Sequence, residues 1–309
     1  MLTDLFILAA SLYVIIKAAT LSTRYAIRLA TDYRLSEYLV GFIIVAVISI
    51  LPEAFISINA AVSGIPAFGL GTLFGSNVAD LTLVFAVIIA FTKKGIKVES
   101  KILRNNIVYP FLLLIPLVLG LDGYYSRWEG SALIMIGAIF YLFAFKNGHG
   151  DRLDEKDHRD RLKNFSLLIL AMAALLVGAH FTVTSATSLA QDLNVTPILI
   201  GMFIVGLGTT MPELLFSLKS VNKHDNALAI GDILGTVLAD ATIVVGILAL
   251  VSPFAFPTRV IYLTGLFMVT AAFILFYFMR TGRRLTKREG VLLVMFWIVF
   301  VLAELMANS

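Results

Sequence analysis

The sequence contains no cysteine and few charged residues. Only 14% of its 309 residues are Asp, Glu, Lys or Arg, whereas 59% are hydrophobic. The absence of cysteine excludes disulfides and thiolate metal sites. The chain also has no glycine-rich phosphate-binding loop before a soluble helix, so we expect no nucleotide or organic cofactor. Too little chain remains between the apolar runs to form a soluble enzymatic domain.

Long hydrophobic runs are present instead, and they predict an all-α polytopic membrane protein embedded in the lipid bilayer. Each run approaches the length that an α-helix needs to cross about 30 Å of hydrocarbon. We expect ten transmembrane helices, at residues 3–19, 36–62, 68–91, 105–121, 129–145, 165–188, 195–218, 226–251, 260–279 and 289–306.

Basic residues cluster in alternate loops between these spans. All Lys and Arg residues except Lys17, Arg127 and Arg259 lie in the loops that follow the odd-numbered spans. By the positive-inside rule these loops face the cytoplasm, so both termini of this cell-membrane protein face outward. The net charge of +4 therefore reflects membrane topology and does not indicate a nucleic-acid partner.

One mixed-charge loop, residues 146–164, separates two halves at 1–145 and 165–309. Its acidic residues alternate with Arg and Lys, which is typical of a solvated cytoplasmic linker. The alternative is a regulatory calcium site formed by the acidic residues Asp151, Asp154, Glu155 and Asp157.

A segment of the first half recurs in the second half without a gap. Residues 41–82 align with 201–242, with the Pro-Glu pair 52–53 over 212–213 and Asp80 over Asp240. Each half holds five spans, so the second copy must enter the membrane in the opposite direction. We therefore expect two inverted five-helix repeats with interrupted helices in spans two, three, seven and eight, a plan that secondary transporters use around a midplane site.

Each repeat places two carboxylates inside apolar helices: Glu53 and Asp80 in the first, Glu213 and Asp240 in the second. A charged side chain at the bilayer centre costs roughly 2.5–3.5 kcal/mol, so such residues indicate function. The proline before each glutamate also frees a backbone carbonyl, which a membrane helix tolerates only where it lines a cavity.

A hydroxyl lies four residues before each of the four acids, and therefore on the same helix face. These hydroxyls belong to Ser49, Ser76, Thr209 and Thr236. A ligand set made only of oxygens suits hard cations such as Ca²⁺ and Na⁺. The pattern therefore predicts a buried cation site.

At these residues the sequence resembles the cation/calcium exchanger superfamily, and most closely its prokaryotic sodium/calcium exchangers. GLGTTMPELLFS at 206–217 is similar to the second repeat motif of that family, and GSNVAD at 75–80 is similar to the end of the first. The resemblance implies a ten-helix antiporter that binds Ca²⁺ or several Na⁺ between spans two, three, seven and eight. It also implies that spans one and six form a sliding gate.

The resemblance further implies a role for each matching residue. Glu53 and Glu213 would be central ligands, Ser49 and Thr209 would assist Ca²⁺, and Asp80 and Asp240 would line the middle of the cluster. Flanking Na⁺ sites would use Ser76, Thr236 and Thr210, together with the backbone oxygens of Ala46 and Gly206.

Three positions depart from the family pattern. Ile50 replaces the hydroxyl that the second repeat retains as Thr210, Asp80 lies where many sodium-coupled relatives carry Asn, and Val237 replaces the counterpart of Asn77. The leading hypothesis is exchange of Ca²⁺ for Na⁺ by alternating access. A Ca²⁺/H⁺ antiporter of the same architecture stays open as the alternative.

Two other classes of protein place acids in membrane helices, namely intramembrane aspartyl proteases and passive cation channels. A protease needs two carboxyls in one water-activating dyad, whereas this chain has four in a symmetric duplication beside helix breaks. We therefore expect a secondary transporter and not an enzyme, functional as a monomer.

Overall fold

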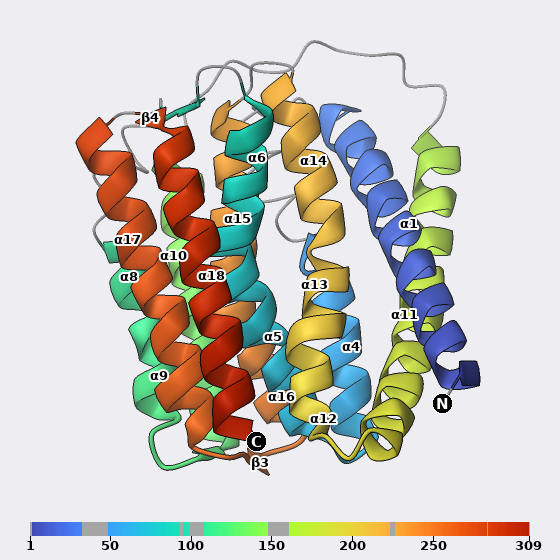
Figure 1. Ribbon diagram of the computed structural model, residues 1–309. Helices are drawn as coiled ribbons and strands as arrows, with labels where there is room; N and C mark the ends of the chain where they lie inside the picture. Colours follow the sequence, from blue (N-terminus) through green and yellow to red (C-terminus); the bar gives the residue numbers. More distant parts are fainter. Residues whose placement is uncertain are drawn as a thin grey trace.

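The computed structural model describes residues 2–32, 49–92, 95–98, 108–147, 161–222, 226–282 and 284–308. These segments are mostly helical and form one bundle, with the N- and C-termini at the same end (Figure 1). Seven of the described helices are long and apolar enough to cross a membrane: Leu2–Ser22, Pro66–Phe91, Leu162–Asp192, Pro197–Asn222, Ala229–Val251, Val260–Arg280 and Lys287–Ala307. The structure is therefore that of a multi-pass membrane protein.

The first half begins with one long helix and continues with shorter ones. The third predicted span runs from α5 through a π-helical turn, η2, into α6. The fourth is divided into α8 and α9. The elements are α1 (Leu2–Asp32), α4 (Leu51–Val62), α5 (Pro66–Ala79), η2 (Asp80–Val84), α6 (Phe85–Phe91), β1 (Ile96–Lys97), α8 (Val108–Leu112), α9 (Leu114–Leu119), β2 (Tyr124–Tyr125) and α10 (Arg127–Asn147).

The second half follows the same order. Its elements are α11 (Arg161–Asp192), α12 (Pro197–Ile200), η4 (Gly201–Val205), α13 (Gly206–Thr209), α14 (Met211–Asn222), α15 (Asn226–Ala239), η5 (Asp240–Val244), α16 (Val245–Val251), β3 (Phe254–Ala255), η6 (Val260–Gly265), α17 (Leu266–Gly282), β4 (Arg284–Leu285) and α18 (Lys287–Asn308). Most of the predicted linker, residues 148–160, lies outside the described residues.

Helix irregularities recur at equivalent positions of the two halves. A non-helical turn residue, Ile50 or Thr210, lies two residues before each Pro-Glu proline. Spans three and eight are not broken but each carries a π-helical turn, which begins at Asp80 and at Asp240. A threonine stabilises both π turns by donating to the carbonyl four residues back, at 2.5 Å in the first and 2.6 Å in the second. Such π turns are frequent at functional sites.

Short strand pairs close the two ends of the bundle. β1 pairs with β4 and β2 pairs with β3, both antiparallel. In Figure 1, β4 and β3 lie at opposite ends. A capping box follows β2 and another follows β4: Ser126 with Glu129, and Thr286 with Glu289. Each box satisfies free backbone N–H groups where α10 and α18 begin.

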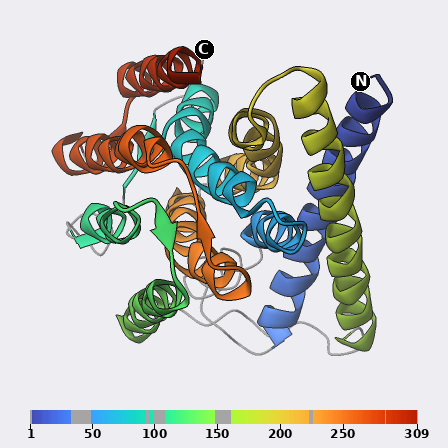
Figure 2. The ribbon, with the colours of Figure 1, turned by 90° about the horizontal axis from the view of Figure 1, so that it is seen from below.

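Helices α1 and α11 lie side by side at one edge of the bundle (Figure 2). Gly178 permits their close approach, since a Cβ there would lie 2.8 Å from Ile15 Cγ1. Thr182 on α11 also donates a 2.9 Å hydrogen bond to Ser11 on α1. The pair packs on α4 and α12 through its own apolar cluster, separate from the larger core around α5, α15 and α17.

Candidate cation-binding site

The four carboxylates singled out in the sequence are all buried inside the helix bundle. Glu53 lies in the first turn of α4 and Glu213 in the first turn of α14, each directly after its proline. Asp80 and Asp240 begin the two π turns. None of the four side chains is more than 1% exposed.

Close helix packing brings these elements together. A Cβ at Gly75 would lie 2.6 Å from the carbonyl oxygen of Met202, and one at Gly206 would lie 3.1 Å from the backbone nitrogen of Ser76. Because these positions carry no side chain, α5 contacts the backbone of η4 and α13 directly. Asp80 thus lies on a helix packed against the one that precedes Glu213.

The four carboxyl groups lie near enough to one another to interact electrostatically. Glu53 interacts in this way with Asp80, Glu213 and Asp240, and Asp80 interacts with Glu213 and Asp240. Within the described ranges, however, no three acidic or histidine side chains are close enough to hold one metal ion in this conformation. The four acids therefore share one buried region but do not surround a single ion-binding point in this conformation.

All five predicted hydroxyl ligands are buried. Thr209 lies within hydrogen-bonding reach of Glu53 across the two halves. Ser76 and Thr210 donate to carbonyls of their own helices, at 3.0 Å and 2.9 Å. Thr236 Oγ1 has no partner among the described residues. Gly206 is buried, and Ala46 lies outside the described residues.

Buried oxygens without partners concentrate in this region. They include both carboxylate oxygens of Asp80, Glu213 and Asp240, and Oε2 of Glu53. A buried polar atom without a hydrogen bond is costly, and a buried charge costs far more. Oxygens left free on four helices are therefore suited to bind cations.

A fifth buried carboxylate, Asp232 on α15, was not predicted from the sequence. It is fully buried, and its Oδ1 accepts a 3.0 Å hydrogen bond from Ser49 Oγ. Asp232 also interacts electrostatically with Asp80 and Glu213. The repeat does not reveal Asp232, because its counterpart in the first half is Thr72. Its position inside a predicted span is the sequence signal for it, as it is for Glu304, a buried acid that accepts a hydrogen bond from Thr264.

Two tyrosines also support the site. Tyr109 and Tyr141 donate 2.6 Å hydrogen bonds to the carbonyls of Leu234 and Gly235, next to Thr236. Both tyrosines come from the first half and hold α15 of the second half. Asn77 makes a third cross-half contact, since its Nδ2 donates to the carbonyl of Val237 at 3.3 Å.

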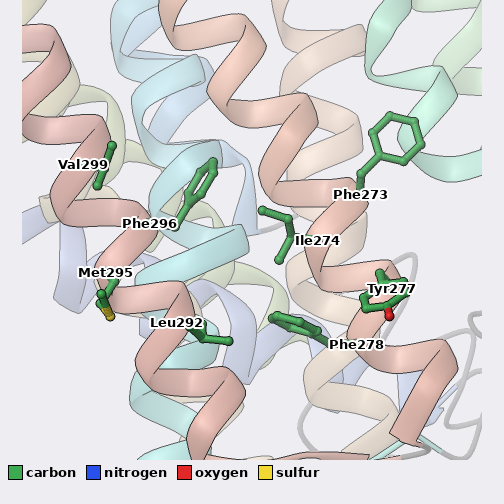
Figure 3. A pocket seen from close by; sticks show the side chains of 8 residues that line it. All are labelled: Phe273, Ile274, Tyr277, Phe278, Leu292, Met295, Phe296 and Val299. Carbon is green, nitrogen blue, oxygen red and sulfur yellow. The ribbon is translucent and has the colours of Figure 1, made fainter.

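An apolar groove of about 520 Å³ lies elsewhere, between α17 and α18. Its lining is aromatic and aliphatic, including Phe273, Phe278 and Phe296 (Figure 3). It is lined by none of the buried carboxylates, so it is not part of the candidate site.

A multi-pass helical bundle with buried, unpartnered acids on paired helices defines a secondary cation transporter as the class of protein. The profile of the sodium/calcium exchanger protein family matches residues 3–146 and 163–306. The chain belongs to this family.

Individual relatives agree with this assignment. The chain is 26% identical over 277 residues to an uncharacterized membrane protein of Methanocaldococcus jannaschii, covering 89% of each chain. It is 23% identical to the sodium/calcium exchanger MaX1 of Methanosarcina acetivorans, covering 96% of this chain and 97% of the other. A solved structure of the sodium-calcium exchanger NCX_Mj, soaked with Na⁺ and Sr²⁺, has the same fold, with a TM-score of 0.71, 22% identity and 96% coverage of each chain.

Proposed function

We propose that this protein is an antiporter that exchanges Ca²⁺ for Na⁺ by alternating access at a carboxylate cluster near the membrane midplane. The observation that carries the proposal is the set of buried, unpartnered carboxylate oxygens on α4, α5, α14 and α15 with their π turns. Several negative charges in a region of low dielectric cannot all persist without cations. Binding of one ion type must therefore displace the other.

The proposed framework is ten spans in two inverted repeats, 1–145 and 165–309, joined by the linker 146–164. Matching Pro-Glu turns, π turns, capping boxes and strands at equivalent positions support it. Both termini lie at one end of the bundle, in agreement with an even number of spans (Figure 1). The distribution of basic residues assigns this end to the outside and the linker to the cytoplasm.

The proposed ligands keep the roles that the family motif implies. Glu53 and Glu213 bind Ca²⁺ with Ser49 and Thr209, while Asp80 and Asp240 lie between them. The flanking Na⁺ ligands are Ser76, Thr210, Thr236 and the backbone oxygens of Ala46 and Gly206. Helices α1 and α11, which pack together at the edge of the bundle, form the sliding gate.

Uptake of ⁴⁵Ca²⁺ into proteoliposomes tests the coupling ion. An outward Na⁺ gradient is expected to drive uptake, and a pH gradient alone is not. Uptake driven by pH and indifferent to Na⁺ would overturn sodium coupling. Flux that persists without any counter-ion would indicate a channel.

The second candidate is a Ca²⁺/H⁺ antiporter. Two departures favour it: Ile50 supplies no side-chain oxygen, and Asp80 adds a carboxylate whose two oxygens lack partners. Under this alternative the double substitution Ile50→Ser and Asp80→Asn increases Na⁺ dependence. If the variant keeps the coupling of the unchanged protein, these residues do not determine the coupling ion.

A further inference from the structure

Asp232 breaks the symmetry of the site. The equivalents of Ser49 and Asp232 in the other half are Thr209 and Thr72, and Thr72 has no charge. Thr72 Oγ1 donates to the carbonyl of Phe68 on its own helix, at 3.0 Å. A carboxylate at this position, paired with the repeated hydroxyl, therefore occurs in one half only.

Asp232 and Ser49 both have oxygen lone pairs that no described residue uses and that could bind a cation. Oδ1 of Asp232 accepts a hydrogen bond from the Ser49 hydroxyl, while Oδ2 is buried and has no hydrogen-bond partner among the described residues. A hydroxyl that donates its proton keeps its lone pairs, so Ser49 Oγ remains able to ligate a cation. Two hard oxygens from different halves thus lie together with free lone pairs.

The position of the pair along the helices places it beside the four acids. Ser49 precedes Glu53 by one helical turn. Asp232 precedes Asp240 by eight residues, or about 12 Å of helix rise, towards the start of α15. Helix α15 begins soon after α14 ends at Asn222. Under the proposed topology this end faces the cytoplasm.

We propose that Ser49 and Asp232 form a further cation subsite on the cytoplasmic side of the four-acid cluster. It takes Ca²⁺ as the ion passes between the cytoplasm and Glu53. This inference rests on the proposed function. Asp80 and Glu213 lie near enough to Asp232 to interact with it electrostatically. A cation at the subsite is therefore also attracted by these two acids of the main cluster.

Transport measured from each side tests the subsite. Everted and right-side-out membrane vesicles give the half-saturating Ca²⁺ concentration on the cytoplasmic and outer sides. Asp232→Asn keeps the size of the side chain and an acceptor for Ser49 but removes the charge. We expect it to raise the cytoplasmic value about tenfold or more and the outer value much less, since loss of one supporting ligand weakens metal binding by roughly that factor.

Thr72→Val is the matched control, because it alters the equivalent position of the other half. It is expected to leave both values unchanged. If Asp232→Asn leaves both values unchanged, or raises both equally as a packing defect would, the subsite is overturned. If the unchanged protein exchanges Ca²⁺ in neither vesicle type, the proposed function fails, and the subsite fails with it.

A second measurement uses the unchanged protein and does not depend on the folding of a variant. Crystals soaked with Mn²⁺ are expected to show an anomalous peak beside Asp232 Oδ2. A peak confined to the other four carboxylates would overturn the subsite while leaving the proposed function intact. If none of the five carboxylates shows a peak, both the subsite and the proposed function are contradicted.

Discussion

At the scale of single residues, the site is defined by buried oxygens that the protein itself does not satisfy. Glu53 and Glu213 each follow a proline at a helix start, and both are almost fully buried. Their burial agrees with their sequence context, in which an acid directly after a helix-breaking proline recurs in both halves. Asp232 lacked this signal, since only the folded chain shows that Ser49 contacts it.

The first prediction concerns the central glutamates. Glu53→Gln and Glu213→Gln are each expected to reduce Ca²⁺ exchange at least a hundredfold, because each removes a charged ligand while keeping side-chain volume. The measurement is ⁴⁵Ca²⁺ uptake by equal amounts of folded protein. Glu129→Gln is the control, since glutamine also completes a capping box. Exchange at the normal rate in both central variants would contradict the ligand assignment.

A second prediction concerns the tyrosine that supports α15. Tyr141→Phe removes the hydrogen bond to the Gly235 carbonyl and is expected to cost about 1 kcal/mol of stability. Thermal unfolding in detergent measures the loss as a lower Tm. Tyr262→Phe, at a position that is 58% exposed, should leave the Tm unchanged. Equal effects of the two substitutions would argue against a supporting role for Tyr141.

At the scale of elements, the irregular helices are the parts that the two halves share most closely. The helix break before each Pro-Glu pair was predictable from proline chemistry. The π turns at Asp80 and Asp240 were not, because spans three and eight contain no residue that requires one. The two-stranded pairs were also missed, since two residues per strand carry no periodic pattern.

Close packing between α5 and η4 leads to a third prediction. Gly75→Ala is expected to destabilise the protein strongly and to impair exchange, because the new Cβ would meet Met202 Cγ at 2.5 Å and its carbonyl oxygen at 2.6 Å. Gly290→Ala is the control, since its nearest neighbour is Ile89 Cγ2 at 3.2 Å. Thermal unfolding and uptake should separate the two variants. A normal Tm for Gly75→Ala would refute the close approach.

At the scale of the whole molecule, α1 and α11 form a unit that lies along the remaining bundle (Figure 2). Hydrophobic runs correctly predicted a multi-pass membrane protein. The division into two halves remains a prediction. The pairing of α1 with α11 could not be read from these signals, because the contact joins residues more than 150 positions apart, such as Ser11 and Thr182. The resemblance to exchangers implied only that these two spans form a gate.

The absence of cysteine allows a fourth prediction to be tested by cross-linking. A Cβ at Gly208 would lie 3.4 Å from Leu12 Cγ, so Leu12→Cys with Gly208→Cys can form a disulfide between α1 and α13. Oxidation is expected to stop transport by fixing the gate to the site, and reduction to restore it.

The control pair joins the two helices of the proposed gate to each other. Ile15→Cys with Gly178→Cys links α1 to α11, so oxidation should leave transport intact. If both disulfides stop transport equally, or neither does, α1 and α11 do not move as one unit against the bundle.

The most direct test of the central claim is anomalous diffraction from crystals soaked with Sr²⁺ in place of Ca²⁺, with and without excess Na⁺. We predict a peak among Glu53, Asp80, Glu213 and Asp240 that Na⁺ removes. A peak elsewhere, or one at these residues that Na⁺ does not affect, would contradict Ca²⁺ and Na⁺ exchange at this cluster.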